Sequence, residues 1–165
     1  MIQTNIVKVG MADLNVLAGS GILKTTGLGS CVGLTLYDRV KKISGMAHVM
    51  LPDSSIARDG VPNRAKFADT AVPELVARME QLGASRERME AKLAGGAQMF
   101  AFSGSAPETM RIGPRNVESC REALRRLSIP IVAEDTGGNY GRSIELDGDT
   151  GILVIRSANR GVKEI

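Results

Sequence analysis

The sequence has no tryptophan, two tyrosines and three phenylalanines, so aromatic residues make up only 3% of its 165 residues. So few aromatic rings leave little surface on which nucleic-acid bases could stack. The net charge is +3, and the acidic and basic residues are interspersed rather than gathered into a polybasic segment. The composition therefore gives little support to nucleic-acid binding.

Long hydrophobic runs are also missing. No segment approaches the ~18 consecutive apolar residues of a membrane-spanning helix, and residues 1–19 lack the basic start and apolar core of a signal peptide. The two cysteines, Cys31 and Cys120, are too few for a disulfide framework. We expect a reduced, cytoplasmic protein that folds as a single domain over residues 1–165.

The sequence gives little support to a metal site or a nucleotide-binding site. The single histidine, His48, and two distant cysteines cannot form the usual structural zinc site, and we expect neither a metal nor a cofactor. Gly27, Gly29 and Gly33 are spaced GxGxxxG rather than GxGxxG, and a strand-like segment follows them, which argues against a dinucleotide-binding loop. Residues 134–139, EDTGGN, could hold a phosphate through backbone N–H groups, but a tight turn explains them equally well.

What the sequence does contain is a regular order of strand-like and helix-like segments. The first helix is predicted after Asp69, a possible N-cap, and ends at Gly83, with its apolar positions at Val72, Leu75, Val76, Met79 and Leu82. A second helix is predicted over residues 116–127, and the strands over 5–10, 14–19, 31–38, 41–52, 88–100 and 131–157. This order predicts an α+β fold with layers, in which mostly antiparallel sheets carry two helices packed on one side.

The two cysteines have different surroundings. Cys120 lies on the apolar stripe of the second predicted helix, which is typical of a core residue. Cys31 follows Gly27 and Gly29 and precedes Gly33, so the backbone there can bend sharply and let another molecule approach. Glycines at such places are also common in plain β-bulges. The local sequence therefore leaves Cys31 open between a core residue and a nucleophile.

The pairing of two strands bears on this choice. A hairpin with a four-residue loop and Tyr37 opposite Lys42 sets one apolar face in register, with Val32, Leu34 and Leu36 opposite Ala47, Gly45 and Ile43. The same register places Cys31 directly opposite His48 on the other face. Directly opposed residues have Cβ atoms about 4.5–5.5 Å apart, so the hairpin predicts contact between a thiol and an imidazole.

Such a pair has a clear chemistry. A free thiol has a pKa near ~8.5, and a neighbouring imidazolium lowers it. Histidine can take the thiol proton and later deliver a proton to a departing amine. Any Cys–His pair in this chain must use His48. The alternative is a strand histidine whose ring bonds to a backbone carbonyl.

Several segments, in order from Thr25 to Gly151, resemble the CheD family, the chemoreceptor glutamine deamidases of bacterial and archaeal chemotaxis. They are LGSCV with LYD, GMAHVMLPDS, KFADTAV, AKLAGGAQMF, IGPRNVE, AEDTGGN, and GRSIELD with TG. The resemblance implies a layered α/β/β sandwich and a cysteine-dependent hydrolase with a Cys–His–Thr triad. The family's cysteine falls on Cys31, its histidine on His48 and its threonine on Thr25, with Thr26 as the neighbouring alternative.

The resemblance also implies a reaction and partners. Cys31 attacks the side-chain carboxamide of a receptor glutamine, which ends as glutamate, and the backbone at Gly27, Gly29 and Ser30 forms the floor of the cleft and the oxyanion site. The implied partners are the cytoplasmic helices of methyl-accepting chemotaxis receptors and CheC, a CheY-P phosphatase. Phe100 and Phe102 are candidates for the CheC surface, although core packing explains them as well.

Two other readings remain open at this point. In one, the protein is mainly a non-catalytic regulatory module that binds receptors or CheC. In the other, it is a thiol-dependent receptor methylesterase, because ester hydrolysis passes through the same acyl-enzyme.

Overall fold

The computed structural model of the chain describes residues 5–56, 63–99 and 111–165. Strands and helices alternate along these ranges in the predicted order. They are β1 (Ile6–Lys8), β2 (Leu14–Ala18), β3 (Ile22–Leu28), β4 (Val32–Asp38), β5 (Ile43–Val49), α1 (Ala68–Gln81), β6 (Met89–Gly95), α2 (Ile112–Arg126), β7 (Ile131–Thr136), β8 (Arg142–Asp147), β9 (Leu153–Ser157) and β10 (Gly161–Glu164), with short 3-10 turns at Ser54–Ile56 and Arg86–Arg88.

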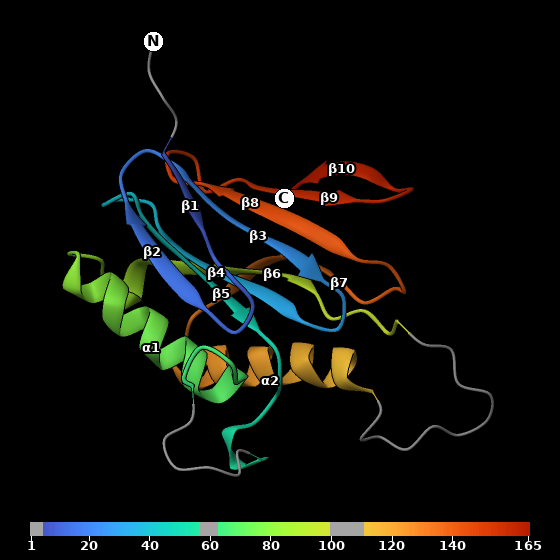
Figure 1. Cartoon of the computed structure of the whole chain (residues 1–165). Coiled ribbons are helices and arrows are strands. Elements are labelled where there is room, and N and C mark those ends of the chain that lie inside the picture. The colour runs from blue at the N-terminus through green and yellow to red at the C-terminus, as the bar shows by residue number, and fades with distance from the viewer. Residues whose placement is uncertain (1–4, 57–62, 100–110) are drawn as a thin grey trace.

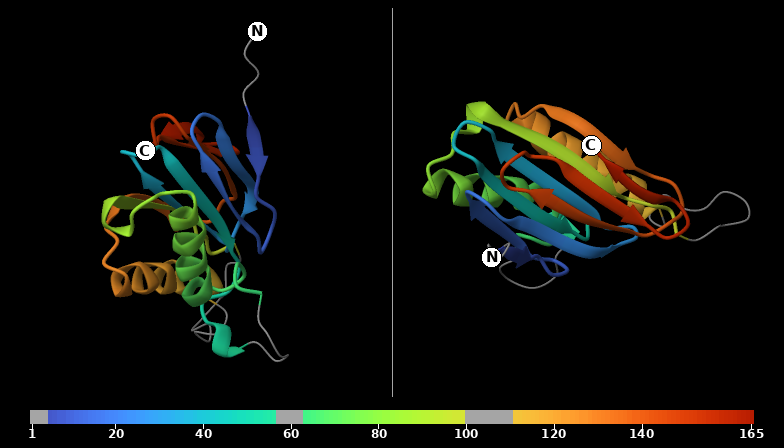
Figure 2. Two further views of the ribbon diagram at one scale, coloured as in Figure 1. Left: turned by 90° about the vertical axis from the view of Figure 1, so that its left-hand side faces the viewer. Right: turned by 90° about the horizontal axis from the view of Figure 1, so that it is seen from above.

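The strands form two five-stranded sheets that lie face to face (Figure 1). We call β1-β3-β8-β9-β10 the outer sheet and β2-β5-β4-β6-β7 the central sheet. Six strand pairs are antiparallel, whereas β1–β3 and β6–β7 are parallel. Both helices cover the face of the central sheet that points away from the outer sheet (Figure 2). The predicted α/β/β sandwich with two helices on one side is confirmed.

The central sheet is buried on both faces, which explains why β4 and β5 have no exposed residue. On the helix side its side chains pack with α1 and α2 in one cluster, which includes Val32, Leu34, Leu36, Val72, Leu75, Met79, Cys120 and Leu124. On the other side they meet the outer sheet in a second cluster, which includes Cys31, Met46, Leu23, Leu28 and Ile144. The candidate nucleophile therefore belongs to the layer between the two sheets.

The helices begin earlier than the sequence predicts. Phe67, not Asp69, precedes α1, and the Asp69 carboxylate instead accepts hydrogen bonds from the N–H and hydroxyl of Ser54 at 2.9 and 2.6 Å. The end is as expected, because Gly83 takes a φ of +109° after the last turn. Helix α2 starts at Ile112, four residues before the predicted start at Asn116. None of the helices in the described ranges is long and apolar enough to cross a bilayer.

The predicted register of the β4–β5 hairpin is wrong by two residues. Gly33, not Cys31, lies opposite His48, and Asp38 pairs with Ile43. A shift of two residues leaves every side chain on its predicted face, so Cys31 and His48 still point to the same side. The predicted core face is buried as expected, with different partners across the strands.

The cause of the shift is a buried charge at Asp38. The prediction placed this residue in the loop, but its side chain is fully buried and bonds to Arg88 and to the Ser85 N–H at 2.9 Å each. Burial alone would raise the pKa of this carboxyl, but the hydrogen bonds from Arg88 and the backbone outweigh burial and hold the pKa below its usual value. With Asp38 in the strand, the loop moves on to residues 39–42, where Lys42 adopts a φ of +52°.

Candidate active site

A threonine and a histidine from different sheets meet between the layers. The hydroxyl oxygen of Thr25, in β3, lies 2.8 Å from Nδ1 of His48, in β5. The same hydroxyl donates a hydrogen bond of 2.7 Å to the backbone carbonyl of Val9. Both side chains are buried, with exposures of 2% for Thr25 and 0% for His48. This contact joins the outer sheet to the central sheet through polar atoms.

The two bonds of Thr25 fix the tautomer of His48. A carbonyl can only accept, so the single hydroxyl hydrogen of Thr25 lies on the bond to Val9. The Thr25 oxygen therefore accepts the second bond, and Nδ1 of His48 carries a hydrogen. In the neutral ring the other nitrogen, Nε2, then holds a free lone pair. Nε2 is buried, and no described residue forms a hydrogen bond with it. His48 is thus arranged to accept a proton at Nε2.

Cys31 lies on the same face as His48, one step along the strands. It precedes β4 and packs with Leu28, Met46 and Ile144 between the sheets. Because Gly33 is directly opposite His48, Cys31 is the diagonal neighbour of His48. Diagonal neighbours on paired strands are about 7–8 Å apart, with their Cβ atoms somewhat closer, and an aromatic ring such as imidazole can span part of that distance. The predicted direct opposition of the two residues is replaced by this diagonal relation.

Burial favours the neutral form of both Cys31 and His48. Burial raises the pKa of the Cys31 thiol, and a hydrogen bond from its own backbone N–H offsets only part of that rise. Burial also lowers the pKa of His48. A thiol that ionises less readily, beside an imidazole that protonates less readily, is a neutral pair rather than a thiolate–imidazolium ion pair.

The backbone around Cys31 is held by a second glycine-rich segment. The N–H of Gly96 donates to the Cys31 carbonyl, and the N–H of Ala97 donates to the Gly29 carbonyl, both at 2.9 Å. Gly95 has a φ of +106°, and a Cβ there would collide with the carbonyl oxygen of Cys31. This close approach of two backbones requires glycine at position 95.

The predicted cleft floor is only partly open. Gly27 is exposed with a φ of +72°, and a Cβ there would meet nothing. Gly29 lies under Met99, and Cys31 itself is only 8% exposed. Gly33 is fully packed, because a Cβ there would collide with Ile144 from the outer sheet. The glycines before Cys31 therefore border the surface, whereas Gly33 makes room for the packing between the sheets.

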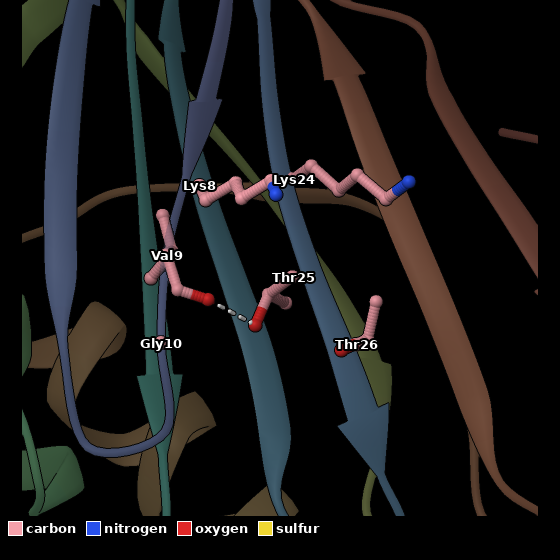
Figure 3. Close-up of a pocket in the computed structure, with 6 residues that line it drawn as sticks. All are labelled: Lys8, Val9, Gly10, Lys24, Thr25 and Thr26. Atoms are coloured by element: carbon pink, nitrogen blue, oxygen red, sulfur yellow. Dashed lines mark hydrogen bonds between the residues drawn. The ribbon is translucent and has the colours of Figure 1, made fainter.

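A pocket of about 360 Å³ opens beside Thr25, where the pairing of β1 and β3 ends (Figure 3). It is lined by Lys8, Val9, Gly10, Lys24, Thr25 and Thr26. Figure 3 shows the Val9 carbonyl directed at the Thr25 hydroxyl. Cys31 and His48 are not among these lining residues, so of the three predicted site residues only Thr25 borders the pocket.

The structure separates the two threonines and the two cysteines. Thr25 contacts His48, whereas Thr26 is exposed beside the pocket. Cys120 is fully buried in the core under α2, and burial raises the pKa of its thiol to about 12. Phe100 and Phe102, the candidates for a partner surface, lie outside the described residues.

Three residues near the site were missed by the sequence analysis. Asn116 was placed at a helix start, but it is fully buried and bonds to the backbone on either side of the site. Arg142, 3% exposed, donates to the carbonyls of Gly95 and Gly137 and supports the segment behind Cys31. Gly95 and Gly96 were treated only as part of the predicted strand over 88–100. The paired glycines were a usable signal, but the buried asparagine and arginine have no local pattern that marks them.

Comparisons with known proteins agree on one family. The family model described as CheD chemotactic sensory transduction matches residues 50–157, a range that begins after Cys31 and His48. Curated relatives cover those residues as well. The chemoreceptor glutamine deamidase CheD of Halalkalibacterium halodurans is 55% identical over 163 residues, which is 99% of this chain and 100% of that protein.

Other relatives are similar over comparable lengths. The probable chemoreceptor glutamine deamidase CheD of Geobacillus kaustophilus is 54% identical over 96% of both chains. The Bacillus licheniformis chemoreceptor glutamine deamidase CheD is 47% identical over 99% of this chain and 96% of that protein. Among solved structures, the hypothetical protein YfiH of Bacillus licheniformis aligns over 75% of this chain and 50% of that one, with 14% identity and a TM-score of 0.48.

Proposed function

Because this chain belongs to the CheD family, we propose that it is a thiol-dependent deamidase that converts specific glutamines of chemoreceptors to glutamates. The observation that carries this proposal is the contact of Thr25 with Nδ1 of His48, which leaves Nε2 free to accept a proton. Cys31 is the proposed nucleophile, because it is the cysteine that shares a face with His48.

The reaction begins with transfer of the Cys31 proton to Nε2 of His48. The sulfur attacks the side-chain carboxamide carbon of the glutamine, and the carbonyl becomes an oxyanion. The imidazolium of His48 then gives its proton to the amide nitrogen, the C–N bond breaks and ammonia leaves. A water that loses its proton to His48 attacks the thioester, the C–S bond breaks, and the proton returns to sulfur. Thr25 keeps the imidazole in one orientation throughout.

The oxyanion is proposed to bind backbone N–H groups of the bend from Gly27 to Cys31. In the free protein the N–H of Gly29 donates to the Gly27 carbonyl at 3.1 Å. The N–H of Ser30 is therefore the better donor for the oxyanion. Those of Gly29 and Cys31 are recruited only if their present hydrogen bonds, to the Gly27 carbonyl and to the Cys31 thiol, open.

The proposed partner is a cytoplasmic helix of a methyl-accepting chemotaxis receptor, in keeping with the relatives' names. A CheC-type phosphatase is a further proposed partner that rests on the family resemblance alone. We also propose that residues 1–165 work as one domain in the cytoplasm, without a metal or cofactor.

Mass spectrometry of receptor cytoplasmic fragments tests the proposal. Incubation with the protein should release ammonia and give the mass increase that marks glutamine becoming glutamate. Cys31→Ala should abolish both signals, whereas Cys120→Ala, which removes the other thiol, should retain them. Undiminished release by a folded Cys31→Ala variant would disprove the proposed nucleophile.

The two alternatives give different results in the same assay. A non-catalytic module would bind the fragments without releasing ammonia. A methylesterase would release methanol from methylated fragments and leave the glutamines unchanged.

A further inference from the structure

The pairing of strands β4 and β5 ends where the candidate site begins. Their pairing runs from Asp38–Ile43 to Val32–Val49 and ends there. Beyond it the N–H of Met50 donates to the Lys66 carbonyl, and the Cys31 carbonyl accepts from Gly96. The segment that carries Cys31 and the segment that follows His48 thus turn to different neighbours. The backbone carbonyls of Ser30 and Met50 lie just beyond the end of this pairing.

One side chain donates a hydrogen bond to each of these two carbonyls. Nδ2 of Asn116, in α2, lies 2.9 Å from the carbonyl oxygen of Ser30 and 2.9 Å from that of Met50. A primary amide has two N–H donors, so a single group can satisfy both carbonyls. Ser30 directly precedes Cys31, and Met50 follows His48 by two residues. Asn116 therefore ties together the backbone segments that carry the nucleophile and the base.

An asparagine at position 116 is better explained by the hydrogen bonds that it donates than by packing. Asn116 is fully buried, and its Oδ1 forms no hydrogen bond with any described residue. A buried acceptor without a partner costs stability, so an asparagine is a poor filler for an apolar layer. Instead, its side chain places two N–H donors at a fixed distance from helix α2. Helix α2 contacts both β4 and β6, so this distance is set by packed elements.

We propose that Asn116 is a positioning residue for the deamidase reaction, and that its amide sets the separation of Cys31 and His48. The proposal rests on the function proposed above. Within the described residues, Asn116 forms no hydrogen bond with the Cys31 thiol or the His48 ring and acts only through the backbone of their neighbours. Its loss should therefore slow the chemical step and leave receptor binding unchanged.

Two variants remove the donors in different ways. Asn116→Asp keeps the shape of the side chain but places a carboxylate against two carbonyl oxygens. Asn116→Ala removes the amide altogether and introduces no charge. The matched control is Cys120→Ala, because Cys120 is fully buried on the same helix, four residues later, and has no contact with either carbonyl. All variants are compared at a temperature where circular dichroism shows them folded.

The first readout is steady-state deamidation of a receptor fragment. Misplacement by about 1 Å can cost about 100-fold in rate, so we expect kcat to fall by about 10- to 100-fold with KM unchanged. Cys120→Ala should stay close to wild type. A fall in kcat no larger than that of the control, or a rise in KM alone, would overturn the proposal.

The second readout is independent of the receptor. It uses the rate of Cys31 alkylation by iodoacetamide, with and without His48→Ala. In the wild type and in Cys120→Ala, loss of the histidine should slow alkylation. In Asn116→Ala, the same loss should change the rate little, because the two side chains no longer meet. An equal effect of His48→Ala in all three backgrounds would refute the positioning role.

These readouts separate the two proposals. If the wild type deamidates no fragment, the proposed function fails, while the alkylation cycle still decides whether Asn116 couples Cys31 to His48. If Asn116→Asp does not fold, the smaller Asn116→Ala decides both readouts.

Discussion

The hydroxyl of Thr25 in the outer sheet and the imidazole of His48 in the central sheet are joined by a hydrogen bond of 2.8 Å. Since Val9 takes the hydroxyl hydrogen, Thr25 accepts from Nδ1 and holds the ring in one tautomer. The tautomer of His48 therefore depends on how the two sheets are placed relative to each other.

Replacement of Thr25 tests this dependence. Thr25→Val keeps the shape of the side chain but leaves Nδ1 of His48 buried without a partner. We expect a loss of about 1–3 kcal/mol in the free energy of unfolding and a fall in kcat of at least about 100-fold, the lower end for general acid–base catalysis. Thr25→Ser, which retains the hydroxyl, should keep most of both.

Nitrogen-15 NMR measures the tautomer itself. The chain has one histidine, so its two ring-nitrogen signals are unambiguous in a protein without a histidine tag. The wild type should show Nδ1 protonated and Nε2 unprotonated at neutral pH. A protonated Nε2 in the wild type would contradict the assignment.

The pH dependence of kcat/KM should reflect a neutral pair. Acid protonates Nε2 and removes the base, and burial lowers the pKa of His48, so the acid limb should lie below the ordinary value of about 6.5. Alkali removes the thiol proton that the departing amine needs. Burial raises the pKa of Cys31, so this limb should lie above about 8.5. Activity on a receptor fragment should be nearly constant between them. An acid limb above pH ~6.5 would contradict the neutral pair.

The two thiols should differ strongly in alkylation by iodoacetamide. The thiolate is the reactive form, and Cys120 is both fully buried and raised in pKa to about 12. Cys31 is 8% exposed and has a smaller upward shift. Peptide mass mapping should find the label on Cys31 well before Cys120 in the folded protein, and on both in urea. Equal labelling of the folded protein would argue against a special environment for Cys31.

Gly95 and Gly161 form a matched pair for testing the backbone behind Cys31. Both have positive φ values, +106° and +78°, so alanine strains the backbone at either position. Only at Gly95 would the new Cβ collide with the Cys31 carbonyl, whereas at Gly161 nothing lies within 4 Å. Urea unfolding should show Gly95→Ala less stable than Gly161→Ala by about 1–3 kcal/mol, the usual range for overpacking.

We expect the same difference between Gly95→Ala and Gly161→Ala in their deamidase activity. Gly95→Ala should lower deamidation because it moves the backbone of the nucleophile, and Gly161→Ala should not. Equal stability and equal activity would mean that the segment behind Cys31 yields without disturbing the site.

Local patterns were enough to predict the layered fold. The apolar spacing of α1 follows its buried face, and the apolar alternation of β4 and β5 follows the face of the central sheet that packs against the helices. They failed where a distant residue decides the structure. Asp38 entered the strand because Arg88, fifty residues away, compensates its charge. That single compensation shifted the hairpin register by two residues, while the period of two kept Cys31 and His48 on one face.

The residues of the candidate site also fall into two groups, those that the sequence identifies and those that depend on distant contacts. Cys31 and His48 could be selected from sequence because each has few competitors, and the family resemblance added Thr25. Asn116 and Arg142 could not, because their role depends on carbonyl groups that only the folded chain brings within reach. A side chain that bonds to backbone carbonyls is not marked by any characteristic residue spacing in the sequence.

The partner that takes the Thr25 hydrogen is Val9, which directly follows β1. Strand β1 has three residues, lies at the margin of its sheet and pairs with β3 alone. A strand held on one side frays more easily than its neighbours. When β1 leaves β3, the Thr25 hydroxyl regains a free hydrogen and can offer it to Nδ1, and the imidazole proton then moves to Nε2. The tautomer of His48 is thus tied to an edge strand of the outer sheet, so detachment of β1 would place the ring hydrogen on Nε2 and remove the lone pair that accepts a proton.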